Sequence, residues 1–159
     1  MELHGFTRPV CGSGLIIALL LSAGCGPSAK PKPMTPAEQN LSKFFRLYTA
    51  YRSSLKGRPN ADVEELKKWA QQQPKEKLAE MGIEDLDKVF ISPRDNEPYV
   101  LVNLPMGMGP MAAHEKTGSG GSRLVANTSG EVFEANAKRF KELEDTISKM
   151  PSGPMKKGK

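Results

Sequence analysis

A single apolar run near the N-terminus, residues 15–23, most constrains what this 159-residue chain can fold into. It is far shorter than the roughly 20 apolar residues that a bilayer-spanning helix needs. A short apolar core that follows a flank carrying Arg8 and precedes small residues is typical of a secretory signal. We therefore expect residues 1–24 to be a signal peptide that is removed, so that the folded body comes from the rest of the chain.

The apolar run ends in Ala23, Gly24 and Cys25, after Leu21 and Ser22. This motif resembles the lipobox of bacterial lipoproteins. The resemblance implies that the signal is cut between Gly24 and Cys25, that the Cys25 sulfur carries a covalent diacylglyceryl group, and that the new amino terminus carries an acyl chain. Only cysteine offers such a polarisable sulfur nucleophile. The family usually has leucine where Ser22 stands, and the alternative is that Cys25 lies near an ordinary signal cleavage site.

The resemblance to lipoproteins also implies a location. Two or three acyl chains hold a protein on a membrane more firmly than one does, so membrane lipid is the expected partner of Cys25. Lipoproteins that stay in the inner membrane usually have an acidic residue after the cysteine, where this chain has Gly26. We expect a lipid-anchored protein of the bacterial cell envelope, with the periplasmic face of the outer membrane favoured.

Proline and charge patterns divide the chain after the signal. Prolines alternate with lysines before Met34, which predicts an extended tether over residues 25–35. Thr35 can cap a helix, with proline at the first helical position and Glu38 three residues after the cap. The folded domain is therefore expected over residues 36–150. Residues 151–159 are basic and are expected to form a disordered tail.

Hydropathy patterns in the body predict an α+β fold, with an N-terminal helix packed on a small antiparallel sheet and a C-terminal helix. Aromatic and aliphatic residues at helical spacing between Leu41 and Leu55 predict a long first helix. Residues 98–104 give the strongest strand signal, and their apolar side chains need cover on both faces of the sheet. The remaining expected elements are helices over 62–72, 74–81 and 137–150, and strands over 112–115, 123–127 and 131–134.

Three segments of the body form a further pattern. Residues 57–60, Gly-Arg-Pro-Asn, follow the first helix, residues 63–66 begin the second, and residues 92–99 lead into the strands. This order is similar to that of the soluble domain of type II secretion major pseudopilins and related pilin-like proteins, over about residues 41–135. The resemblance implies one helix laid across a small antiparallel sheet. Pilins have a long apolar N-terminal helix where this chain has a lipobox and a proline-rich spacer.

Side chains that would predict catalysis are not grouped in the body. His114 is the only histidine after the signal, whereas a zinc site needs three or four ligands. The glycine-rich residues 118–121 lack the lysine of a phosphate loop and the frame of a nucleophile elbow. We expect no catalytic residue, no metal and no cofactor beyond the lipid on Cys25. With aromatic residues at only 6%, we also expect no nucleic-acid partner.

The segment 106–111 is unusual because it contains Met106, Met108 and Met111. These methionines either cover the edge of the core or form an adaptable contact with a partner. The alternative is a solute site or a soft-metal site, since thioethers bind copper(I). Taken together, the sequence predicts a non-enzymatic, lipid-anchored envelope protein that presents a small pilin-like domain to another envelope protein.

Overall fold

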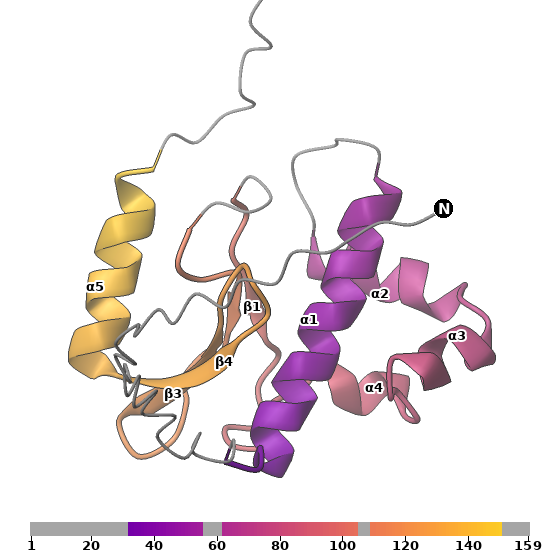
Figure 1. Ribbon diagram of the computed structural model, residues 1–159, viewed down its shortest axis with the longest axis horizontal. Helices are drawn as coiled ribbons and strands as arrows, with labels where there is room; N and C mark the ends of the chain where they lie inside the picture. The colour runs from indigo at the N-terminus through magenta and orange to yellow at the C-terminus, as the bar shows by residue number, and fades with distance from the viewer. Residues whose placement is uncertain (1–31, 56–61, 105–108, 151–159) are drawn as a thin grey trace, which may run out of the picture. The chain divides into compact units, whose positions relative to one another are not determined.

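The computed structural model describes residues 32–55, 62–104 and 109–150 (Figure 1). The elements below all belong to the compact unit that begins at Pro33. The expected signal peptide and the basic tail lie outside the described residues, as does most of the expected tether. None of the helices in the described part combines the length and the apolar character needed to cross a membrane.

The first half of the unit is helical. Helix α1 begins where the sequence predicts, because Thr35 and Glu38 form a capping box: the Glu38 amide donates to Thr35 Oγ1 at 3.3 Å, and the Thr35 amide donates to Glu38 Oε2 at 2.6 Å. The side-chain carboxylates of Asp62 and Asp85 accept hydrogen bonds from backbone amides and so cap α2 and α4. The helices are α1 (Pro36–Ser54), α2 (Val63–Gln71), α3 (Lys75–Glu80) and α4 (Leu86–Val89).

The second half is a four-stranded antiparallel sheet followed by one helix. The strands are β1 (Val100–Leu101), β2 (Ala113–His114), β3 (Ser122–Ala126) and β4 (Val132–Asn136), and α5 (Ala137–Ser148) follows β4 directly. The strands lie side by side in the order β1-β2-β3-β4. In the β3–β4 hairpin, Leu124 pairs with Glu134. The prediction of an α+β fold with a helix on a small antiparallel sheet and a C-terminal helix is confirmed.

The strongest strand signal, over residues 98–104, overestimates the strand. Only Val100 and Leu101 form β1, and Pro98 makes an isolated bridge with Ile91. Proline has no amide hydrogen to extend a ladder, which limits the strand at its start. At its end, the Leu104 amide donates to the Val102 carbonyl at 3.0 Å, so the chain turns out of the sheet.

The two faces of the sheet are covered by different helices (Figure 1). Alternate residues of a strand point to opposite faces. Leu124 and Ala126 of β3 therefore pack in the core with α1, whereas Val125 packs in a second cluster with Phe140 of α5. Helices α2, α3 and α4 lie on the side of α1 that faces away from α5 (Figure 1). The expected cover on both faces is thus provided by α1 and α5.

Aromatic side chains join α1 to the rest of the core. Phe44 has no exposed surface, and its ring lies 5.7 Å from that of Phe90 and 5.0 Å from that of Tyr99. Tyr51 lies 5.5 Å from the Trp69 ring of α2. The aromatic stripe that predicts α1 is therefore also the surface that binds α1 to α2, to the segment after α4 and to the sheet.

Replacement of Phe44 with alanine should cost about 3–5 kcal/mol of unfolding free energy, because it leaves a cavity beside the rings of Phe90 and Tyr99. Phe45, the next residue on α1, is only partly buried, and we expect F45A to cost about 1 kcal/mol. Urea titrations followed by Trp69 fluorescence measure both losses. Equal losses for F44A and F45A would show that the core is not centred on Phe44.

Candidate functional site

The residues that the sequence singles out fall in different places. Gly24 and Cys25 lie outside the described residues, and so do Met106 and Met108. Met111 is described, and its side chain is 2% exposed in the cluster beneath α5. A partner contact by the methionine segment would therefore have to use Met106 and Met108, because Met111 is part of the core.

The structure gathers polar side chains around one arginine, and we call this group the Arg94 cluster. Its centre is Glu115, which has no exposed surface. Glu115 Oε1 accepts a hydrogen bond from Ser92 Oγ at 2.8 Å, and Oε2 accepts one from the Leu124 amide at 2.7 Å. The cluster consists of Ser92, Arg94, Glu115, Ser122 and Glu134.

Arg94 connects the segment after α4 to the sheet. Its Nε lies 3.7 Å from Glu115 Oε1, and its Nη2 donates to Glu134 Oε1 of β4 at 2.8 Å. The same nitrogen lies 3.1 Å from the Ser119 carbonyl oxygen. A buried carboxylate is costly unless a cation and hydrogen bonds compensate it. Arg94 supplies that cation from a side chain that is only 20% exposed.

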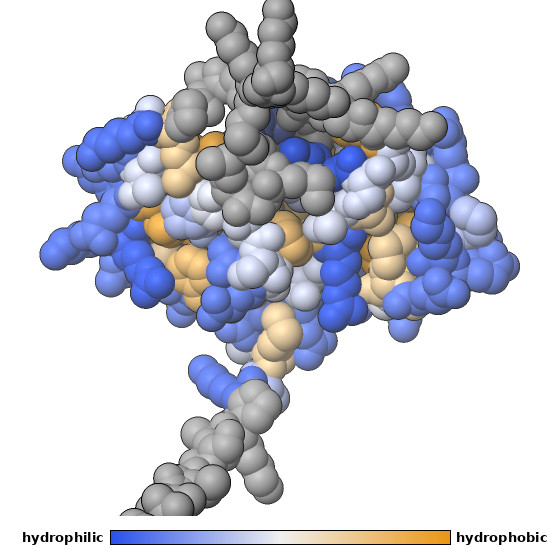
Figure 2. Space-filling model, turned by 45° about the horizontal axis from the view of Figure 1, so that its top comes forward, coloured by the Kyte–Doolittle hydropathy of each residue, from blue (hydrophilic) through white to orange (hydrophobic). Residues whose placement is uncertain are grey.

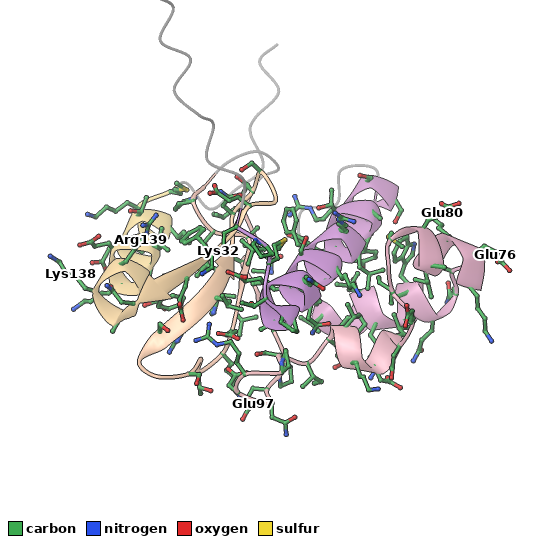
Figure 3. The ribbon with its side chains drawn as sticks, turned by 60° about the horizontal axis from the view of Figure 1, so that its bottom comes forward. Lys32, Glu76, Glu80, Glu97, Lys138 and Arg139 are labelled. Atoms are coloured by element: carbon green, nitrogen blue, oxygen red, sulfur yellow. The ribbon has the colours of Figure 1, made fainter. Side chains whose placement is uncertain are left out.

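Asp95 makes a second connection to the β2–β3 turn. Its Oδ2 accepts hydrogen bonds from the Gly118 amide at 2.8 Å and from the Thr117 amide at 3.0 Å. Burial raises the pKa of Asp95, but these bonds and one from the Glu97 amide outweigh it and lower the pKa to about 2. Glu97 lies at the outer edge of the molecule (Figure 3), where it pairs with Lys116 at 3.1 Å.

Gly118 is required for this contact. Its φ is +75°, a conformation that L-residues with a side chain rarely adopt. A Cβ atom at this position would lie 2.1 Å from the Ser122 carbonyl oxygen. The glycine therefore allows the turn to approach β3 closely while its amide points at Asp95.

The Arg94 cluster and Asp95 hold residues 92–99, which contain little regular structure, against the β2–β3 turn. Ser92 and Glu115 both have no exposed surface. Within the described residues, every buried side-chain nitrogen or oxygen has a hydrogen-bond partner. In the same residues, no three His, Cys, Asp or Glu side chains are grouped to hold a metal ion. In the described structure, this group therefore binds one loop to another.

The sequence alone does not indicate the pair between Arg94 and Glu115. These residues are 21 positions apart, and nothing local links them. One signal is present in the sequence: Glu115 lies two positions after the apolar residues 111–113. A carboxylate that continues a buried strand needs a cation or hydrogen-bond donors nearby.

His114 is buried, and its imidazole has a hydrogen-bond partner. Its side chain is 8% exposed, and its Nδ1 lies 2.7 Å from the Glu115 carbonyl oxygen. On the other side the ring packs edge-on against Phe140 of α5, at a centroid distance of 4.9 Å. The imidazole is therefore part of the contact between β2 and α5.

The described surface carries a shallow groove of about 580 Å³ along α1. Its floor includes Phe45 and Thr49, and its walls are Met81 at the end of α3 and Gly130 in the β3–β4 turn. The Thr49 hydroxyl donates to the Phe45 carbonyl at 2.9 Å, so it is used within the helix. Over the visible face in Figure 2, hydrophilic residues predominate and apolar patches are small and separate.

Comparisons with known proteins add no relative: no protein-family model, curated protein or solved structure matches this chain.

Replacement of Glu115 with alanine should destabilise the domain by about 3–5 kcal/mol, because it leaves Ser92, Arg94 and the Leu124 amide without their shared acceptor. The matched control is E97A. Glu97 forms an exposed pair with Lys116, and such pairs contribute about 0–1 kcal/mol. Denaturant midpoints measure both variants. A loss for E115A as small as that for E97A would contradict the structural role of the cluster.

Asp95 should contribute to the acid stability of the domain. Its pKa is lowered from 3.8 to about 2 by folding. A lowered carboxyl pKa adds stability above the unfolded value and loses it as the pH falls through the folded value. The stability difference between wild type and D95N should therefore shrink between about pH 4 and pH 2. Thermal unfolding of both proteins across this range tests the expectation, and a constant difference would contradict it.

Proposed function

We propose that this chain is a non-enzymatic, lipid-anchored protein of the bacterial envelope that holds a small interaction domain close to a membrane. The observation that carries the proposal is the sequence of Ala23, Gly24 and Cys25 after a short apolar run. In this proposal the Cys25 sulfur carries the lipid, and residues 25–35 form the tether between the lipid and the domain.

The position at which the folded domain begins supports this arrangement. Helix α1 starts at Pro36, directly after the expected tether, and Thr35 caps it. The residue before the cap, Met34, is 41% exposed and does not belong to the core. Eleven residues of extended, proline-rich chain reach about 34 Å at about 3.1 Å per residue. The domain would therefore stay within a short distance of the bilayer surface without inserting into it.

The internal use of polar side chains supports a binding role over a catalytic one. Ser92, Glu115 and His114 carry the groups that catalysis most often uses, and all three are buried in contacts between segments. A tethered binding domain needs only an accessible surface, because the anchor raises its local concentration near a membrane partner. We propose another envelope protein as that partner.

The sheet edge is our candidate contact surface within the described residues. Strand β4 ends the sheet, and none of the other described strands lies on its outer side. An extended segment of a partner can add to such an edge through main-chain hydrogen bonds. The arrangement of α1 on the sheet also supports the proposed likeness to pilin-like domains, although a lipid anchor would replace the apolar helix of a pilin. Gly26 after the lipidated cysteine favours the periplasmic face of the outer membrane.

Metabolic labelling with a clickable fatty-acid analogue tests the anchor. We expect label on the wild-type protein and on C11S, since Cys11 lies in the expected signal peptide, and no label on C25S. Mass spectrometry of the wild-type protein should give an N-terminus at Cys25, and membrane fractionation should place it with the outer membrane. Label that persists in C25S would refute lipidation at this residue.

A further inference from the structure

Helix α5 is attached to the sheet by few buried side chains. Phe140 is the one buried residue of α5, whereas α1 has six buried residues. Leu143 and Ile147 are only partly buried where they pack against the same cluster. Local opening is easiest where few apolar contacts hold an element. The attachment of α5 therefore depends strongly on what surrounds Phe140.

Two basic side chains surround the Phe140 ring. The His114 ring of β2 meets it edge-on at a centroid distance of 4.9 Å, and the guanidinium carbon of Arg123 from β3 lies 4.2 Å from its centroid. A guanidinium over an aromatic face is favourable. A protonated His114 would be a second cation beside the Phe140 ring and would repel Arg123. The contact between the two rings therefore favours a neutral imidazole.

The surroundings of His114 favour the neutral form. Burial lowers the pKa of His114, the hydrogen bond with the Glu115 carbonyl raises it, Arg123 lowers it further, and Glu144 of α5 raises it; the net direction is downward. Its cross-strand partners, Val100 of β1 and Val125 of β3, carry no charge. The charged residues near the imidazole are Glu115, Arg123 and Glu144. Lys141 and Asp145 of α5 line a shallow pocket together with Arg123, Phe140 and Glu144.

We propose that α5 is an acid-released helix: protonation of His114 beneath Phe140 weakens the contact between α5 and the sheet, while the core around α1 stays folded. Release would uncover the apolar face formed by Val125 and Ala135, which α5 covers in the closed form. This device rests on the described domain and does not require lipidation of Cys25.

The direction of the pH effect follows from proton linkage. A histidine whose pKa is lowered by folding binds its proton more readily in the open form, so the closed form loses stability as the pH falls below the ordinary value of 6.5. One proton changes the opening equilibrium by at most about tenfold per pH unit. Below the lowered pKa both forms are protonated and the effect levels off.

Hydrogen–deuterium exchange with mass spectrometry tests the proposal on the full chain as the cell processes it. Exchange is compared between pH 7.5 and pH 5 after correction for the intrinsic pH dependence of amide exchange. We expect peptides from α5 to lose protection below about pH 6.5, by up to about tenfold per unit, and peptides from α1 to keep theirs. In H114Q, whose side chain is neutral throughout, corrected exchange of α5 should not vary with pH.

A second variant keeps the test decisive if H114Q weakens α5 at every pH. Glu144 favours the charged imidazole in the closed form, so E144Q should lower the pKa of His114 in that form further. The loss of α5 protection should then begin at the same pH near 6.5 but become larger and level off at lower pH, while the neutral-pH protection stays unchanged. Equal loss of protection in α1 and α5 would overturn the proposal, because it would indicate global unfolding. The same pH dependence in wild type and H114Q would overturn it as well.

Discussion

The sheet is too small to be stable by its own hydrogen bonds, so the fold depends on the contact between it and the apolar face of α1. Strands β1 and β2 contain two residues each, and short strands become stable only with an apolar face packed on another layer. Burial of one large apolar side chain contributes about 1.5–3 kcal/mol. Leu41, Phe44 and Leu47 of α1 have no exposed surface, so a single helix supplies much of what the strands lack.

Helix α1 also fixes segments that have no regular structure. The Asn40 side-chain amide donates to the Ile91 carbonyl at 2.8 Å and to the Tyr99 hydroxyl at 3.3 Å. Burial raises the pKa of Tyr99 to about 12, with the Asn40 hydrogen bond opposing it, so this hydroxyl stays a neutral partner. Arg52 donates to the Leu104 carbonyl at 3.0 Å. Residues 90–104 are therefore held by α1 on one side and by the Arg94 cluster on the other.

The parts that sequence reasoning predicts well are those whose causes are local. The cap at Thr35, the helical spacing of α1 and the β3–β4 hairpin all depend on residues within a few positions of one another, and the structure confirms them. The Arg94–Glu115 pair depends on how the turn between β2 and β3 meets a distant loop. The predicted length of β1 was wrong for a related reason. Val102 is apolar and its amide still donates to the Ala112 carbonyl, but the chain turns away one residue later, and hydropathy does not record that turn.

The unequal covers on the two faces of the sheet determine where this domain can move without losing its fold. The α1 face includes the aromatic rings and the capped helix start, and the proposed tether joins the domain at that start. The α5 face has a single buried helical side chain, Phe140. Because opening free energies follow buried contacts, we expect α5 to separate from the sheet more readily than α1 does. A change at α5 would leave both the core and the tether junction intact, so the proposed lipid anchor would keep its attachment to the membrane while the exposed surface of the domain changes.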